Sequence, residues 1–245
     1  MSTFFFRQPL VYRDGSYIMH PNNQQRKHHA MHLSSSRIFL QSAARDFKRT
    51  GAVVPSSKAL AHSMISELAL HYRQPAAVLE VGGGTGSITQ RIVHCLSSGD
   101  RLDVFEIDRK FASLIKQRLR QDETFQRLRT GVHVHNKPIE WIERRPQYDF
   151  VISCLPFTNF EPQSVREIFE IYRSVLKPGG ICSFYEYIFI RKAAQIISGN
   201  SVERERVAGV SDVVLEYTAR YCYKHDVVIR NLPPAMVYHI RFARS

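Results

Sequence analysis

The feature that most constrains this chain of 245 residues is a regular alternation of short apolar runs and helix-length segments. The pattern predicts strands at 77–81, 101–107, 132–135, 148–153 and 180–190, and helices at about 58–72, 86–97, 109–120, 139–143 and 162–175. Such alternation indicates a parallel sheet with helices on both faces. A polar, helical segment over about 192–221 and strands at 226–230 and 237–242 follow; these strands predict an antiparallel hairpin on the sheet edge.

A glycine-rich loop follows the first expected strand in the segment Ala77-Val-Leu-Glu-Val-Gly-Gly-Gly-Thr-Gly-Ser-Ile-Thr. In a strand, loop and helix of this kind, backbone N–H groups and the helix N-terminus can face a nucleotide-like ligand. The dinucleotide fingerprint is GxGxxG, but here the glycines at 82, 84 and 86 form ExGxGxG. This spacing resembles motif I of the class I methyltransferases, which use S-adenosylmethionine.

Two further features support that class, although the first, an acidic residue at the end of the second strand, also occurs in dinucleotide-binding folds, so only the second counts against a nicotinamide oxidoreductase. Glu106 ends the second expected strand, where its two oxygens can accept hydrogen bonds from both hydroxyls of a ribose. The segment Leu176-Lys-Pro-Gly-Gly180 resembles the LxPGG turn that precedes the fifth strand in class I methyltransferases. We therefore expect a seven-stranded, mostly parallel, Rossmann-like α/β sheet that ends in an antiparallel hairpin.

The resemblance implies S-adenosylmethionine as the cofactor and predicts the residues that hold it. Gly82, Gly84 and Gly86 are expected to let the methionine and ribose portions pass where any Cβ would collide. Glu80 is expected to order the loop from beneath, and Asn136 to accept a hydrogen bond from the adenine amine. No metal site is expected, and the complete cofactor set is Ser56, Glu80, Gly82, Gly83, Gly84, Gly86, Glu106, Ile107, Asn136 and Ser153.

The fourth strand runs into Ser153-Cys-Leu-Pro-Phe157, where methyltransferases acting on nitrogen often carry an Asn/Asp/Ser-Pro-Pro-aromatic motif. Ser153 is expected to hydrogen-bond an amine, and Phe157 to form an apolar wall with some cation-π attraction. The alternative is that Pro156-Phe157 only ends the strand and packs. The amine proton has four candidate acceptors, each of which can equally be a packing residue: Tyr185, Glu186, Tyr187 and His135. The expected catalytic set is Ser153, Pro156, Phe157, Tyr185 and Tyr187.

Together with the glycine loop and Ser153–Phe157, the segments Thr50-Gly-Ala-Val-Val-Pro-Ser-Ser57 and Arg230-Asn-Leu-Pro-Pro-Ala235 resemble the bacterial phospholipid N-methyltransferases. Those enzymes methylate phosphatidylethanolamine towards phosphatidylcholine, which the resemblance implies for this chain. Cys154 stands where that family usually has glycine, so an ornithine lipid or another amino lipid is an alternative acceptor. Further alternatives are an RNA adenine dimethyltransferase, which shares the glycine loop and basic charge, and a non-catalytic membrane-binding module.

The net charge of +12 favours an anionic partner or surface. Residues 1–35 lack periodicity and are expected to form a flexible arm, whose histidines at 28, 29 and 32 are interpreted as solvated; residues 36–245 form the methyltransferase domain. Within that domain, residues 36–49 predict a basic amphipathic helix that either packs on the domain or lies in a membrane interface. The resemblance favours an anionic membrane, with nucleic acid not expected as a partner.

Four scattered cysteines are typical of reduced thiols, and no apolar run approaches the roughly 20 residues of a membrane span. We therefore expect a cytoplasmic protein, bound peripherally to the inner face of the cytoplasmic membrane. The sequence leaves the oligomeric state open.

Overall fold

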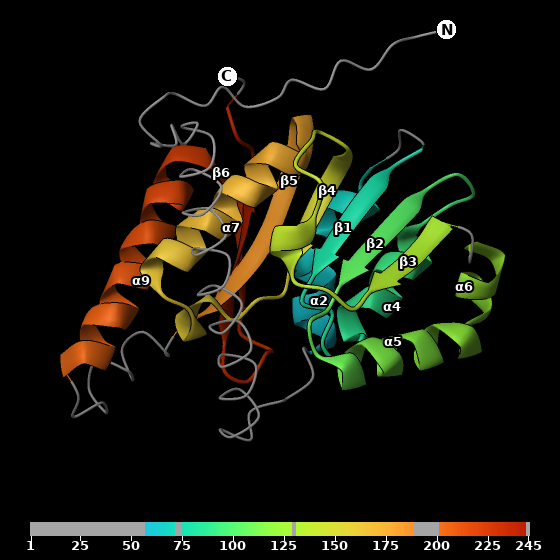
Figure 1. Cartoon of the computed structure of the whole chain (residues 1–245), viewed down its shortest axis with the longest axis horizontal. Helices are drawn as coiled ribbons and strands as arrows, with labels where there is room; N and C mark the ends of the chain where they lie inside the picture. Colours follow the sequence, from blue (N-terminus) through green and yellow to red (C-terminus); the bar gives the residue numbers. More distant parts are fainter. Residues whose placement is uncertain (1–56, 72–74, 129–130, 189–200, 244–245) are drawn as a thin grey trace, which may run out of the picture. The chain divides into compact units, whose positions relative to one another are not determined.

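The computed structural model describes residues 57–71, 75–128, 131–188 and 201–243. In these residues a seven-stranded sheet has the order β3-β2-β1-β4-β5-β7-β6 (Figure 1). The first five strands in this order are parallel, and β7 is antiparallel to both β5 and β6. The predicted fold class is therefore confirmed. The strands are β1 (Ala77–Val81), β2 (Arg101–Phe105), β3 (Val132–His135), β4 (Tyr148–Ser153), β5 (Leu176–Tyr187), β6 (Cys222–Val228) and β7 (Ala235–Ile240).

Helices cover both faces of the sheet, and an apolar core lies on each side (Figure 1). On one face α7 and α9 pack against the strands, and the rings of Phe169 and Tyr217 stack with centroids 4.3 Å apart. On the other face α2, α4 and α5 contribute Met64, Ile92 and Ile115. The helices are α2 (Lys58–Met64), α3 (Ser66–Ala69), α4 (Ser87–Cys95), α5 (Arg109–Gln121), α6 (Glu123–Leu128), α7 (Pro162–Val175) and α9 (Ser201–Tyr221), with 3-10 turns η2 (Ile139–Trp141) and η3 (Phe157–Asn159).

Several element boundaries differ from the predictions. The helix expected over 58–72 is divided at Ile65, although Ser57 caps its start as expected by accepting a hydrogen bond from the Leu60 N–H. The segment Leu176–Gly180 does not precede β5 but forms its first part, where Gly179 has a φ of +82° and the register with β4 shifts. The strand expected at 226–230 begins at Cys222, directly after α9.

Three sequence predictions concern residues outside the described part of the chain. These are the arm at 1–35, the amphipathic helix at 36–49 and the cofactor contact of Ser56. Among the described residues, no helix has the length and apolar character needed to cross a bilayer.

Candidate active site

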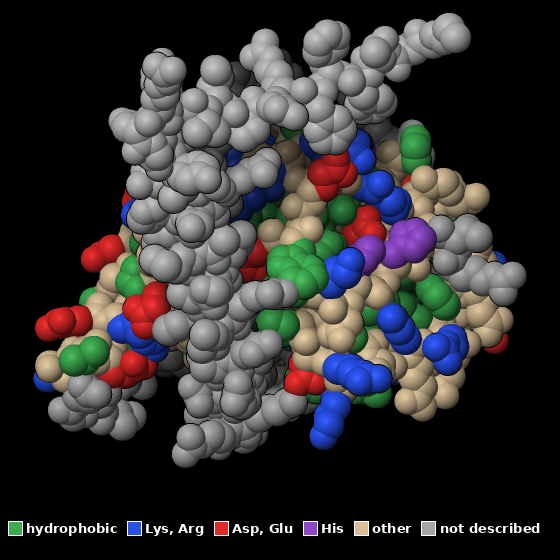
Figure 2. Space-filling model, viewed as in Figure 1, with side chains coloured by type: hydrophobic (Ala, Val, Ile, Leu, Met, Phe, Trp, Pro, Cys, Tyr) green, Lys and Arg blue, Asp and Glu red, His purple; other side chains and the backbone are tan. Residues whose placement is uncertain are grey.

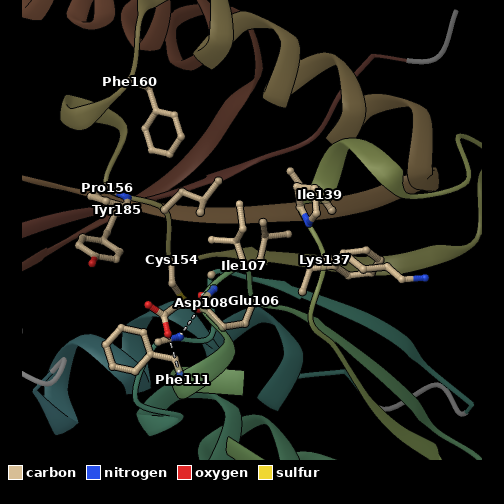
Figure 3. A pocket seen from close by; sticks show the side chains of 16 residues that line it. Glu106, Ile107, Asp108, Phe111, Lys137, Ile139, Cys154, Pro156, Phe160 and Tyr185 are labelled. Carbon is tan, nitrogen blue, oxygen red and sulfur yellow. Dashed lines mark hydrogen bonds between the residues drawn. The ribbon is translucent and has the colours of Figure 1, made fainter. Parts of the chain in front are cut away.

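A pocket lies at the edge of the sheet where the parallel strands end (Figure 3). Gly82 and Gly84 follow β1, Glu106 follows β2, and Leu155 follows β4, and all four line the pocket. Ligands of open α/β sheets bind at this edge, because the strand ends and the loops after them meet there. The topology therefore brings three segments that are distant in sequence to one site.

The glycines of the loop have two different roles. Gly84 has a φ of +52°, and a Cβ there would meet no atom closer than the Gly82 oxygen at 4.0 Å. A Cβ on Gly83 would instead lie 2.7 Å from Ile115 Cδ1 and 2.9 Å from Val104 Cγ1. The backbone at Gly84 is thus open to a ligand in the pocket, whereas Gly83 allows the loop to pack closely on the core.

Glu106 connects the glycine loop to the start of α5. Its two carboxylate oxygens accept hydrogen bonds from the N–H groups of Gly84 and Asp108, each at 2.8 Å. Burial raises the pKa of Glu106, while these hydrogen bonds oppose the increase. Each carboxylate oxygen has a second lone pair, so a ribose hydroxyl can bind here without displacing the loop. The predicted position of Glu106 at the end of β2 is therefore compatible with its predicted role.

Glu80 lies beneath the loop and does not line the pocket. It is fully buried, and its carboxyl oxygens have no hydrogen-bond partner among the described residues. Burial raises the pKa of Glu80 to about 8, and the nearby charge of Glu106 adds to the increase. Glu80 is thus mainly protonated at neutral pH, and no described hydrogen bond joins it to the loop it was predicted to order.

Asn136 holds the connection after β2 rather than lining the pocket. Its side-chain amide donates to the carbonyl oxygens of Glu106, at 2.9 Å, and Ile107, at 3.0 Å. The pocket surface on this side comes from Ile107, Pro138 and Ile139, which form an apolar lining suited to a flat aromatic base. The direct adenine contact predicted for Asn136 is therefore not supported by its place beside the pocket.

Ser153 and Phe157, which were expected to hold the acceptor amine, face the core instead. Ser153 is 1% exposed, and its oxygen accepts a 2.8 Å hydrogen bond from the Tyr172 hydroxyl. Phe157 is 2% exposed and packs between Phe169 and Phe184, with ring centroids 5.2 and 5.7 Å away. Neither side chain lies where it would contact an amine in the pocket, because both point towards the core beneath α7. For Phe157 the alternative of simple packing is confirmed.

Other residues form the wall at this end of the pocket. Figure 3 shows Pro156, Phe160 and Tyr185 together on one side of Glu106, and Leu155 also lines the pocket. Burial raises the pKa of the Tyr185 hydroxyl well above its usual range, so this hydroxyl stays protonated and cannot act as a base at neutral pH. Tyr187 contacts the Tyr185 ring with centroids 5.3 Å apart but does not line the pocket.

The remaining candidate proton acceptors also lie outside the pocket lining. His135 pairs with Asp103 at 2.7 Å and stacks on Phe105 at 4.7 Å. Glu186 is 6% exposed and, next to Tyr185 in β5, points to the opposite face of the sheet. Neither side chain is placed to take a proton from a molecule in the pocket.

Sequence reasoning missed several lining residues. Their only signal is that they follow strand ends: Asp108 follows β2, and Lys137 and Pro138 follow β3. Phe160 has not even this signal, because it follows the 3-10 turn η3. Among the described residues, no group of histidines, cysteines or acids could hold a metal ion.

Known proteins show the same architecture. A family model described as "Methyltransferase domain" matches residues 79–182. An ornithine lipid N-methyltransferase of Singulisphaera acidiphila is 28% identical over 148 residues, which cover 58% of this chain and 73% of that protein.

Two solved structures have similar folds. One is an O-methyltransferase from Streptomyces achromogenes involved in tomaymycin synthesis, solved with S-adenosylmethionine (TM-score 0.58, 16% identity, 84% of this chain and 90% of that one). The other is a Bacillus cereus O-methyltransferase in complex with S-adenosylhomocysteine (TM-score 0.51, 16% identity, 81% and 97% covered).

The sheet order, the matched domain and the pocket above the glycine loop define the class I methyltransferase fold. The protein is an S-adenosylmethionine-dependent methyltransferase, which excludes the nicotinamide alternative. The pocket residues fit this cofactor: Gly84 leaves the backbone open, Glu106 offers acceptors for ribose hydroxyls, and the Ile107–Pro138 side is apolar. When bound, the cofactor supplies a methyl group attached to a sulfonium sulfur.

Proposed function

We propose that this enzyme methylates the primary amine of a membrane amino lipid. The observation that carries the proposal is the apolar wall of the pocket, formed by Leu155, Pro156, Phe160 and Tyr185. Methyl transfer by in-line displacement needs little more than a neutral amine held about 3 Å from the methyl carbon, in a pocket that excludes water. An apolar wall of this kind provides that exclusion.

The wall also favours the reactive form of the amine. An ammonium ion that leaves water for an apolar site has a lowered pKa, so it loses its proton more readily. The lining carboxylates of the described residues, Glu106 and Asp108, lie on the cofactor side and accept backbone N–H bonds. This chain's contribution is therefore to position and desolvate the amine rather than to provide a strong base.

Two head groups are candidates, and different evidence supports each. The similarity to an ornithine lipid N-methyltransferase favours the amine of ornithine lipid. The resemblance of segments 50–57, 153–157 and 230–235 to phospholipid N-methyltransferases favours phosphatidylethanolamine. We rank ornithine lipid first for two reasons. The chain is 28% identical over 148 residues to an ornithine lipid N-methyltransferase, and Cys154 departs from the glycine that is usual in the phospholipid enzymes.

The test is a methyl-transfer assay with purified full-length protein and radiolabelled S-adenosylmethionine. Separate reactions contain vesicles with ornithine lipid, vesicles with phosphatidylethanolamine, vesicles with neither, and unmodified ribosomal RNA. We expect label in the lipid extract of the amino-lipid vesicles, strongest with ornithine lipid, and its loss in the Glu106→Ala variant. Label in RNA alone would refute the proposal.

We also propose that the enzyme works as a peripheral protein at the inner face of the cytoplasmic membrane, with residues 36–49 as one anchor. The excess of 12 positive charges and the basic amphipathic pattern of those residues support this. Sedimentation with anionic vesicles, repeated after deletion of residues 36–49, measures their contribution. Undiminished sedimentation would exclude them as an anchor.

A further inference from the structure

The turn between β6 and β7, residues 229–234, displays large apolar side chains to solvent. Ile229 is 74% exposed and Leu232 is 82% exposed, and Val227 at the end of β6 is 54% exposed. Single exposed apolar residues are ordinary, but a group of them on one projecting turn is typical of an interaction site. We call residues 229–234 the apolar turn.

The apolar turn lies at the same edge of the sheet as the pocket. Ala235, which follows it, pairs with Tyr187 at the end of β5, and the Ile188 N–H donates to the Pro234 oxygen at 2.9 Å. Figure 1 shows this turn, in red, extending beyond β5 where the parallel strands end. Tyr187 also contacts Tyr185, which lines the pocket. The turn and the pocket wall are thus connected through two residues of one strand.

The conformation of the turn is held from within. Asn231 is 5% exposed; its side-chain oxygen accepts a hydrogen bond from the Ser57 N–H at 3.1 Å, and its amide donates to the Pro233 oxygen at 2.8 Å. The turn is therefore attached to the start of α2 by its one buried polar side chain. Ile229 and Leu232 are left pointing outward, so their exposure is a feature of an ordered turn.

Positive charge accompanies these apolar groups. Arg230 lies within the turn, and Arg109, Lys110 and Lys137 follow the ends of β2 and β3 at the same edge of the sheet; all four are exposed. None of them forms an ion pair with another residue in the described part of the chain. Figure 2 shows Lys and Arg side chains along α5 on the face seen in Figure 1. An anionic surface is the partner that such an edge complements.

We propose that the apolar turn inserts into the interface of an anionic bilayer. Ile229 and Leu232 enter the boundary between head groups and acyl chains, while Arg230 stays at the level of the lipid phosphates. The proposal rests on the proposed function, since a lipid acceptor reaches the pocket without leaving the membrane only if the pocket edge faces the bilayer. In this proposal the apolar turn orients the pocket edge towards the bilayer, independently of any membrane contact by residues 36–49.

The first experiment measures binding to vesicles of phosphatidylglycerol and phosphatidylcholine, which contain no acceptor amine. Combined Ile229→Ser and Leu232→Ser substitutions should weaken binding at least tenfold, because two aliphatic side chains no longer leave water. The matched control is Leu215→Ser on α9, which removes a side chain that is 52% exposed away from this edge and should leave binding unchanged. Unchanged affinity for S-adenosylmethionine, measured by calorimetry, shows that both variants are folded.

The second experiment locates the turn directly. The sequence has a single tryptophan, Trp141, so Leu232→Trp combined with Trp141→Phe places the only tryptophan on the turn, where it can be excited selectively. Emission at long wavelength without vesicles, followed by a blue shift and quenching by brominated lipid, is the expected result. Emission that is already blue-shifted without vesicles would mean that protein covers the turn, and absence of quenching would mean that it stays in water. Either result overturns the proposal, whereas absence of lipid methylation alone would refute only the proposed function.

Discussion

Replacement of Ser153 by Ala should reduce the stability of the protein and leave catalysis nearly intact. The Ser153 oxygen accepts the hydrogen bond of the Tyr172 hydroxyl, and both residues are buried. Removal of one partner leaves the other hydroxyl buried without a hydrogen bond, which costs about 1–3 kcal/mol. Tyr172→Phe should have a similar cost. With both substitutions no hydroxyl remains unpaired, so the double variant should be more stable than the sum of the two single changes predicts.

Urea unfolding of the three variants gives the free energies of unfolding, and thermal unfolding should show a decrease of about 2–4 °C for each kcal/mol lost. Methyl transfer is measured on the same samples at a temperature where all of them are folded. We expect kcat/KM to change less than about twofold, since Ser153 does not line the pocket. A tenfold loss of kcat/KM in Ser153→Ala with unchanged stability would show that Ser153 binds the acceptor, and would refute the reasoning.

Three further predictions follow from the glycine loop and the residues around it. Gly84→Ala should weaken S-adenosylmethionine binding at least tenfold in calorimetry. Gly83→Ala should instead cost about 1–3 kcal/mol of stability by overpacking against Ile115. Equal effects of the two substitutions on cofactor affinity would contradict the different roles of these glycines. The folded-state pKa of Glu80, about 8, lies above the ordinary value of 4.5, so the folded protein keeps a proton that the unfolded chain releases. The free energy of unfolding should therefore fall as the pH rises between these two values, which urea unfolding at several pH values measures. The fall should be smaller in Glu80→Gln, and an equal fall in both proteins would show that Glu80 is not its origin. Desolvation and the nearby Glu80 and Glu106 raise the pKa of the Cys154 thiol well above its usual range, so mass spectrometry should show alkylation at pH 8 more than tenfold slower than in urea, and equal rates would contradict the raised pKa.

Much of the fold could be predicted because its signals are local. The periodicity of apolar residues predicts β1, β3, β4 and α7 with the boundaries that the structure has. The glycine loop and Glu106 could also be placed, since each directly follows a strand and its spacing does not depend on distant residues. Boundaries failed where packing overrides local pattern, as in the division of the first described helix at Ile65.

The orientation of side chains near the strand ends could not be predicted in the same way. Ser153 is a sound candidate for amine binding by residue type, yet it faces the core beneath α7, while Tyr185 lines the pocket from a neighbouring strand. In a strand, adjacent side chains point to opposite faces, so the pairing register and the covering helices decide which residue reaches a site.

By itself the sequence determined the class of the enzyme, its cofactor and the segments that follow the parallel strands. Only the tertiary structure decided which of those side chains line one pocket, and it placed Phe160, Cys154 and the apolar turn at the same edge. The physical reason is that motif spacing depends on covalent neighbours, whereas a pocket forms where segments distant in the chain are brought together by the hydrogen bonds of the sheet and the packing of its two cores.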